Sequence, residues 1–281
     1  QTRDAGHVSR KQEQLMSVNE YLLENRKREA AVRFTALSKL FDPGTFRQFD
    51  ACGVTAGWRC WEVGAGGPSL VRKMAGLVGH AGRVLATDID TSRLAKAVEE
   101  NVETRNHDVA HASPPGNGFD LVHARLVLVH VDDRKRAFEN MLASLKPGGW
   151  LVIEDADPEL QPLSCMDARE PGQKLANKIR HGFRTLLAAR GVDLAFGRKL
   201  PRLFREFGLE CISADAYFPV AMPECIALEE STINMLRDQL LSHGVATHAE
   251  IGQHLDNVRS GRLDLSQPPM ISVRGRKPLP A

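Results

Sequence analysis

The stretch that decides the fold is "CWEVGAGGPSL", residues 60–70. An apolar run contains an acid, Glu62, and Gly64, Gly66 and Gly67 follow within a few positions. A bare turn needs fewer glycines, and glycine loses more conformational freedom on folding than any other residue. Because glycine has no Cβ, these residues allow positive φ and close approach of the backbone to a ligand. The stretch therefore predicts a strand-to-helix turn that contacts something other than protein.

Short strands alternate with helices around this turn. The pattern predicts strands at 58–63, 83–88, 102–107, 119–124 and 150–155, and helices at 68–78, 91–100 and 133–145, with "KPGG" (146–149) stopping the last helix. Further strands are predicted near 210–218 and 269–277. Strands that alternate with helices pair in parallel, so the sequence predicts a doubly wound α/β sheet.

The remaining segments are predicted to be helical. Residues 1–57, which include Tyr21, have helical spacing of apolar residues, and Pro43 is expected to end that run. We expect this segment to form a lid, with a plain packing helix as the alternative, and 58–281 to form the main domain. Insertions at about 156–195 and 222–260 are expected to form a cap, whose aromatic residues are candidates for an acceptor pocket or for core. They are Phe183, Phe196, Tyr217 and Phe218, together with Met222.

Composition excludes several functions. The chain has 42% hydrophobic and 26% charged residues and a net charge of +2, without the clustered basic excess typical of nucleic-acid binding. No apolar stretch reaches the roughly 18 residues of a membrane span. The five cysteines are scattered without metal-ligand spacing, which indicates reduced thiols and a cytoplasmic protein. A homodimer is compatible with the sequence.

Acids follow the glycine turn at the ends of the next two strands. Asp88 ends the second strand, where a carboxylate can accept hydrogen bonds from both ribose hydroxyls. Asp108 follows the third strand, where it can meet an adenine amine. Each acid taken alone could equally be a helix cap or a solvated loop residue. Together with the glycine turn, they predict a site for an adenosine-containing ligand.

The negative charge of Glu62, just before the glycine turn, helps to decide which adenosine-containing ligand binds. A dinucleotide fingerprint reads G-x-G-x-x-G, and Ser69 stands at its third glycine. Glu62 would repel a diphosphate but would attract a cation. S-adenosylmethionine (SAM) carries a sulfonium and an ammonium and no phosphate, so charge favours SAM over NAD(P).

At this point the chain resembles a known family. The motifs "EVGAGG", "VLATDID", "NHDVA", "FDLVHARLVLVHV" and "LKPGGWLVIED" are similar to those of class I SAM-dependent methyltransferases, in particular the small-molecule branch labelled UbiE-like or methyltransferase type 11/25. The resemblance covers about residues 58–155. It implies a Rossmann-like, mostly parallel seven-stranded sheet with the last strand antiparallel.

The resemblance also implies cofactor-binding residues. They are Glu62, Gly64 and Gly66 at the methionine portion of SAM, Asp88 at the ribose, Ile89, Asp108 and Val109 at the adenine, and Ala124 and Arg125 on the sulfonium side. Pro68 departs from the family, which has a third glycine there, although proline is tolerated in a first helical turn. A metal-assisted enzyme would need a carboxylate where Ala124 and Arg125 stand, so we expect no metal.

The predicted function is transfer of a methyl group from SAM to O or N of a small, apolar or aromatic metabolite. A hydroxyl or ammonium acceptor requires a base, and His130 and His123 are the histidines nearest the site. His130 is our candidate, with a packed structural histidine as the alternative. Glu154 and Asp155 are expected to face the same pocket. The alternatives are an NAD(P)-dependent oxidoreductase and a non-catalytic SAM-fold binding protein.

Overall fold

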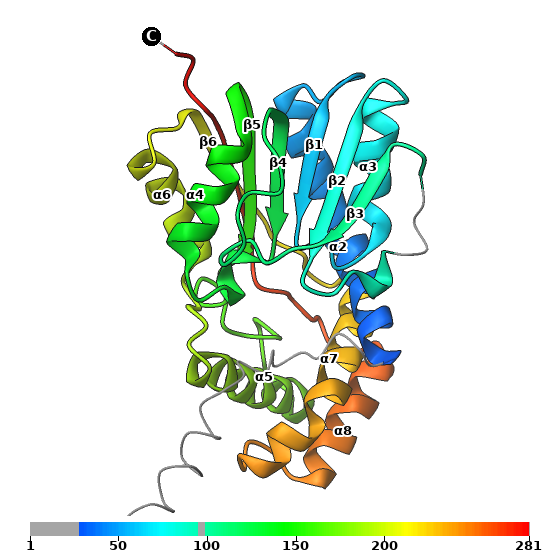
Figure 1. Ribbon diagram of the computed structural model, residues 1–281. Helices are drawn as coiled ribbons and strands as arrows, with labels where there is room; N and C mark the ends of the chain where they lie inside the picture. Colours follow the sequence, from blue (N-terminus) through cyan, green and yellow to red (C-terminus); the bar gives the residue numbers. More distant parts are fainter. Residues whose placement is uncertain (1–27, 95–98, 281) are drawn as a thin grey trace, which may run out of the picture.

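The computed structural model describes residues 28–94 and 99–280. One sheet forms the centre, helices cover both of its faces, and a group of helices lies beyond one end of the strands (Figure 1). Residues 1–27 of the expected N-terminal lid (1–57), Tyr21 among them, lie outside the described residues.

The sheet has seven strands in the order β3-β2-β1-β4-β5-β7-β6. They are β1 (Arg59–Val63), β2 (Arg83–Asp88), β3 (Val102–Asn106), β4 (Phe119–Arg125), β5 (Leu145–Ala156), β6 (Glu210–Tyr217) and β7 (Met270–Arg276). The first five pair in parallel, and β7 runs antiparallel between β5 and β6. The predicted Rossmann-like sheet with an antiparallel last strand is confirmed.

The helices lie on the two faces of the sheet and beyond the ends of its strands. The helices are α2 (Arg28–Cys52), α3 (Pro68–Val78), α4 (Arg134–Ser144), α5 (Pro171–Ala189), α6 (Leu200–Glu206), α7 (Pro223–Ser242) and α8 (His248–Arg259). Successive residues of a strand point to opposite faces. Cys60 therefore packs with Met74 of α3 and Phe49 of α2, while Trp61 belongs to the cluster that contains Phe138 of α4.

Two local predictions need correction. The "KPGG" stretch belongs to β5, because Gly148, at a φ of 75°, donates its N–H to Lys277 O at 2.9 Å and the chain stays beside the sheet. Where a helix was predicted at 91–100, the structure has a 3₁₀ turn, η1 (Thr91–Arg93), which Asp90 caps by accepting the N–H of Ser92. Residues 95–98 lie outside the described part.

Pro43 does not end α2, contrary to the prediction from sequence. Proline in a helix interior costs about 3 kcal/mol, but the turns after Pro43 bury Phe49 completely and Cys52 almost completely against the sheet. Packing of this segment outweighs the penalty. The helix thus runs from the cap, at its beginning, to the sheet, at its end (Figure 1).

The cap consists of α5, α7 and α8. Their apolar faces form one core that includes Ile179, Leu236 and Ile251, and Ala30 of α2 joins it. The chain approaches α5 so closely that a Cβ added at Gly182 would lie 1.9 Å from Val245 Cγ1. None of the described helices combines the length and apolar character needed to cross a membrane.

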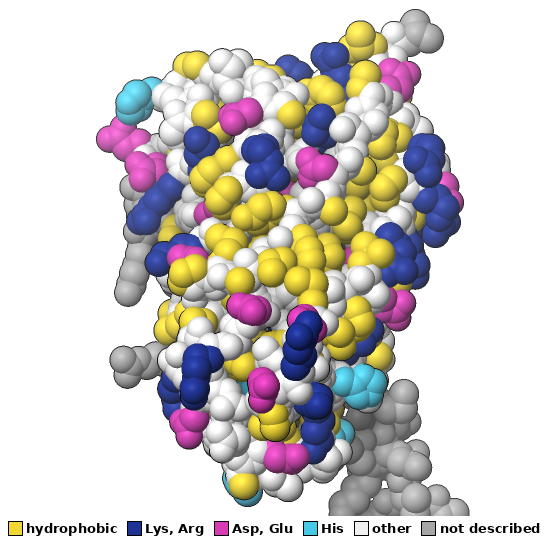
Figure 2. Space-filling view, turned by 180° about the vertical axis from the view of Figure 1, so that it is seen from behind, with side chains coloured by type: hydrophobic (Ala, Val, Ile, Leu, Met, Phe, Trp, Pro, Cys, Tyr) yellow, Lys and Arg dark blue, Asp and Glu magenta, His cyan; other side chains and the backbone are white. Residues whose placement is uncertain are grey.

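The molecular surface agrees with the near-balanced net charge. On the face shown in Figure 2, Lys and Arg side chains are interspersed with Asp and Glu, while hydrophobic side chains gather in a band across the middle. This face has no large patch of a single sign.

Replacing Gly182 with Ala is expected to destabilise the protein by about 1–3 kcal/mol, because the new methyl group overlaps Val245. The double variant Gly182→Ala with Val245→Ala should recover part of that loss. Gly252→Ala in α8 is the control: its Cβ would meet nothing within 4 Å, and the change should stabilise the helix by about 0.5–1 kcal/mol. Urea unfolding measures all three. Equal effects at positions 182 and 252 would contradict the packing.

Candidate functional site

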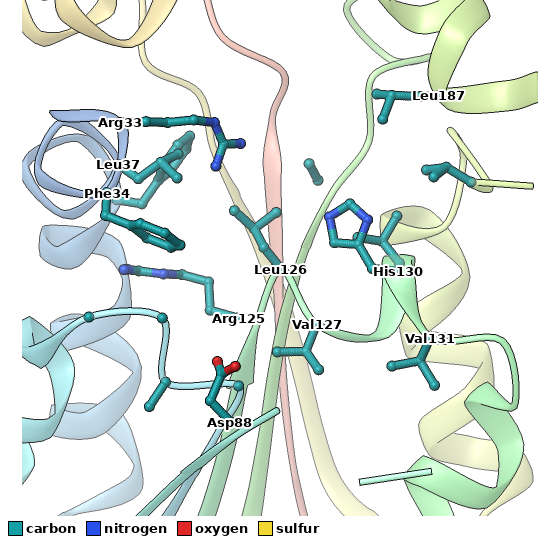
Figure 3. Close-up of a pocket in the computed structure, with 18 of the residues that line it drawn as sticks. Arg33, Phe34, Leu37, Asp88, Arg125, Leu126, Val127, His130, Val131 and Leu187 are labelled. Carbon is teal, nitrogen blue, oxygen red and sulfur yellow. The ribbon is translucent and has the colours of Figure 1, made fainter. Parts of the chain in front are cut away.

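A cavity of about 1160 Å³ lies between the carboxyl ends of the parallel strands and the cap. Ligand pockets usually measure about 300–1,000 Å³, so this cavity has room for a cofactor and a second molecule. The glycine turn, the ends of β2 and β4, the first half of α2 and helices α5 and α7 form its walls (Figure 3). This is where ligands bind in doubly wound sheets.

Most of the residues singled out in the sequence line this cavity. They are Glu62, Gly64, Gly66, Asp88, Ile89, Asp108, Val109, Arg125 and His130. Ala124 does not reach the cavity, because it lies inside β4 and is completely buried; the wall begins one residue later, at Arg125. Among the expected aromatic lining residues of the cap, Phe183 is at the cavity, whereas Phe196 belongs to the core beside α4.

The glycine turn is shaped by protein side chains as well as by backbone freedom. Gly64 has a φ of 64°, and a Cβ there would lie 2.3 Å from Val127 Cγ2. A Cβ on Gly66 would lie 2.5 Å from Phe34 Cε1. Phe34 of α2 therefore covers the turn from the cap side, and neither glycine can be replaced without moving a neighbour.

The acids at the ends of β2 and β3 are held by backbone amides. Asp88 Oδ1 accepts the N–H of Asp90 at 2.9 Å, and its carboxylate points into the cavity (Figure 3). Burial raises the pKa of Asp88 despite that bond. Asp108 Oδ1 accepts the N–H of Ala110 at 2.9 Å. Ile89 leaves 73% of its surface exposed at the cavity, an apolar face open to a planar ring.

Glu62 is fixed by a buried histidine. His123 lies opposite Glu62 in the pairing of β4 with β1, and its Nδ1 is 2.6 Å from Glu62 Oε2. Its Nε2 is 3.1 Å from Glu154 Oε2. Burial alone would lower the pKa of His123, but the two carboxylates outweigh burial and raise the pKa to about 9. His123 is thus an imidazolium between two carboxylates, and it is structural.

The same network ties α2 to the sheet. Thr45 donates its hydroxyl to Glu154 Oε2, and Ser272 of β7 donates to Glu154 Oε1 at 2.5 Å. Burial would raise the pKa of Glu154, but His123, Arg125 and Ser272 together lower it. Glu154 therefore holds the sheet and α2 together. The sequence predicted that it faces the cavity, but it does not line the cavity.

Asp155 also faces away from the cavity. It is completely buried, and its carboxylate lies against the backbone of Leu128 and Val129. Burial raises its pKa well above the usual range. Side chains alternate along β5, and the cavity is reached only by the next residue, Ala156.

Arg125 is shared between the cavity and α2. Its Nη2 is 2.9 Å from Asp42 Oδ1, and its Nη1 donates to Thr45 Oγ1 at 3.0 Å. Asp42 also accepts the hydroxyl of Ser69 in the first turn of α3. The guanidinium therefore joins β4, α2 and, through Asp42, the helix that follows the glycine turn.

His130 lies across the cavity from Arg33, in the turn η2 (Leu128–His130) (Figure 3). Burial, together with the positive charges of Arg33 and Arg134, lowers the pKa of His130 to about 4. The imidazole is consequently neutral at physiological pH and has a lone pair that can accept a proton.

Leu126 was not identified from the sequence. It has a φ of 57°, in the left-handed region that costs a bulky residue about 1–3 kcal/mol, and its N–H donates to Glu154 O at 2.8 Å. Its side chain stands in the middle of the cavity, between Arg33 and His130 (Figure 3). This backbone strain depends on the pairing of Leu126 with β5, and no local sequence pattern predicts it.

Within residues 28–94 and 99–280, no group of three or more His, Cys, Asp or Glu side chains is arranged to hold a metal ion.

The chain is similar in sequence and structure to known methyltransferases. A family model described as a methyltransferase domain matches residues 16–214. The ubiquinone/menaquinone biosynthesis C-methyltransferase UbiE of Vibrio cholerae is 30% identical over 148 residues, which are 48% of this chain and 57% of that enzyme. The chain thus spans little more than half the length of this curated relative.

Two solved structures extend the likeness to the whole fold. A phosphoethanolamine N-methyltransferase 2 of Haemonchus contortus, solved with phosphomonomethylethanolamine and S-adenosylhomocysteine, matches with a TM-score of 0.58 at 16% identity, over 94% of this chain and 61% of that one. The [4+2]-cyclase SpnF matches with a TM-score of 0.50 at 16% identity, over 92% and 86%. At these identities the likeness concerns the fold.

The sheet order and the ligand cavity at its switch point define the fold of class I SAM-dependent methyltransferases, as expected from the motifs. The chain belongs to the methyltransferase-domain family, whose model covers well over half of its residues.

Replacing His123 with Gln should destabilise the protein by about 3–5 kcal/mol, because it leaves two buried carboxylates without their cation. The folded-state pKa of about 9 lies above the usual 6.5. The stabilisation by His123 is therefore complete below about pH 6.5 and is lost as the pH rises through 9. Urea unfolding between those pH values should show this loss, about 3 kcal/mol, in the wild type but not in the variant.

Buried cysteines such as Cys52, whose pKa burial raises to about 12, add an alkaline loss common to both proteins. The difference between wild type and variant isolates His123. An identical alkaline loss in the two proteins would contradict the imidazolium.

Proposed function

We propose that the chain transfers a methyl group from SAM to an oxygen or nitrogen of a small metabolite with an apolar or aromatic body. The observation that carries this proposal is the single cavity in which Glu62, Asp88 and Asp108 line one end and apolar cap side chains line the other. Family membership supports SAM as the methyl donor. The five free cysteines, four of them buried, support a reducing compartment such as the cytoplasm.

The residues at the sheet end fit SAM. Asp88 has a carboxylate directed into the cavity for the ribose hydroxyls, and Ile89 offers an open apolar face for the adenine. Glu62, held in place by His123, supplies negative charge for the ammonium and sulfonium groups. SAM supplies an electrophilic methyl group on sulfur, with a neutral thioether as leaving group.

The chain's contribution to the chemistry is orientation, exclusion of water and removal of a proton. Orientation of two reactants can supply about 7–11 kcal/mol of the barrier. Phe34 and Leu126 narrow the space between the two ends of the cavity. A hydroxyl or amine becomes strongly acidic as its bond to carbon forms, so a weak but neutral base is sufficient. His130, with a pKa of about 4, is in the required unprotonated form.

The fold also occurs in a cyclase, so binding and turnover must be tested separately. Isothermal titration with S-adenosylhomocysteine (SAH) and with NADH tests the cofactor, and incubation with SAM and a metabolite library, followed by mass spectrometry, tests transfer. NADH binding without SAH binding would contradict the proposal. SAH binding without any mass shift would favour a non-catalytic binding protein.

Asp88→Asn should weaken SAH binding about 10- to 100-fold, since it removes a charged acceptor from the ribose hydroxyls, a loss of about 1.5–3 kcal/mol. Asp133→Asn, at the N-cap of α4, preserves capping and should leave the affinity unchanged. Titration calorimetry compares the two. Unchanged affinity in Asp88→Asn would remove this residue from the site.

His130→Asn should lower the rate of methyl transfer about 100-fold or more and leave SAH affinity unchanged. In the wild type, ¹H–¹⁵N spectra of the His130 ring should show an imidazole that stays neutral from pH 8 down to about 5, because its pKa is about 4. A ring that titrates near its usual pKa, or a variant with full activity, would contradict the assignment.

A further inference from the structure

The charged residues of the cavity are separated by sign. At the sheet end, the charged side chains near the glycine turn and strand ends are mainly acids, namely Glu62, Asp88, Asp90 and Asp108, and Arg125 among them is paired with Asp42. Toward the cap they are mainly arginines, namely Arg33, Arg180 and Arg190, with Glu229 as an acid among them. A cation is therefore favoured at one end of the cavity and an anion at the other.

Arg180 of α5 is the deepest of these arginines, with only 5% of its surface exposed. Its Nη2 donates to Glu229 Oε2 at 3.2 Å and to Ser266 O at 3.3 Å. A guanidinium has five N–H groups, and both of these bonds use one nitrogen. The rest of the guanidinium is available to a ligand in the cavity.

Glu229 balances the charge of Arg180, but it does not occupy the remaining N–H donors of the guanidinium. His254 Nε2 lies 3.0 Å from Glu229 Oε1, so both carboxylate oxygens already have partners on the protein. Burial would raise the pKa of Glu229, but Arg180 and His254 lower it to about 2. Glu229 is therefore a fixed counter-charge that holds Arg180 in place.

Gln267 provides an independent observation at the same place. It lines the cavity with 6% of its surface exposed, and its Nε2 has no oxygen or nitrogen acceptor within the described residues. The side chain interacts with the thiol of Cys225, but sulfur is a weak acceptor. A ligand oxygen would be a stronger acceptor for this buried donor.

Arg190, at the end of α5, adds positive charge on the cap side. It donates to Leu186 O, and among the described residues no carboxylate is bonded to it. Arg134 donates to the carbonyl oxygens of Leu128 and Val129, so its charge lies beside His130 at the strand ends.

We propose that the cap end is a subsite for an anionic oxygen group, a carboxylate or a phosphate, on the methyl acceptor, with Gln267 and Arg180 as its donors. This inference rests on the proposed function, and it adds a charged end to the apolar acceptor. The apolar body lies along Phe183, Leu187 and Met235, which line the same cavity. The acids at the sheet end repel the same anion and so fix the direction in which the acceptor enters.

Titration calorimetry on the SAH-loaded full chain tests the subsite with three probes of similar shape: 1-naphthoate, 1-naphthyl phosphate and the neutral 1-naphthamide. At least one anion should bind about tenfold or more tightly than the amide, and the tighter anion identifies the chemistry. Equal affinities, or no binding of either anion at millimolar concentration, would overturn the proposal.

Gln267→Leu should reduce that anion preference about tenfold. Gln239→Leu is the matched control: Gln239 also lines the cavity, but its buried atom without a partner is the acceptor Oε1, so its loss should leave the preference unchanged. A preference that survives in Gln267→Leu would overturn the assignment. SAH affinity is measured first in every protein: failure to bind SAH defeats the proposed function, whereas normal SAH binding without anion preference defeats only the subsite.

Discussion

The site depends on one buried charge, the imidazolium of His123 between Glu62 and Glu154. An unpaired carboxylate inside the sheet would cost several kcal/mol. Here β1, β4 and β5 each contribute one member of the charge chain: Glu62 pairs directly with His123, and Glu154 lies two positions beyond the β5 partner of His123. The hydrogen bond from His123 therefore fixes the direction of Glu62 at the edge of the cavity, where an acid on a loop would lack such support.

Helix α2 is held by the same buried network, and its first half forms the wall of the cavity above the glycine turn. Thr45 binds Glu154, and Asp42 binds Arg125, so the middle of the helix is fastened to the carboxyl ends of β4 and β5. Phe34, which precedes Asp42 by about two turns of the same helix, packs over Gly66. The position of Phe34 above the glycine turn thus follows from hydrogen bonds made at the sheet.

The fold and the cavity edge could be predicted from the sequence because their signals are local. Strand and helix periods and the glycine cluster depend on neighbouring residues, and so do acids such as Asp88 at strand ends. The errors concern features set by pairing between distant segments. Glu154 faces His123 and not the cavity because of strand register, Pro43 stays helical because Phe49 is buried, and the backbone of Leu126 is strained by its bond to β5.

The separation of charge within one cavity has a mechanistic consequence. A cationic methyl donor and an anionic acceptor would attract each other in free solution, but with no fixed orientation. With mainly acids at the sheet end and mainly arginines toward the cap, each of the proposed ligands would have its own electrostatic minimum, and the opposite arrangement would place like charges together. Leu126 stands between the two ends (Figure 3). Because that boundary is apolar, the anionic group of the proposed acceptor would stay on the cap side, and only its uncharged end would reach the sulfonium methyl group beside His130.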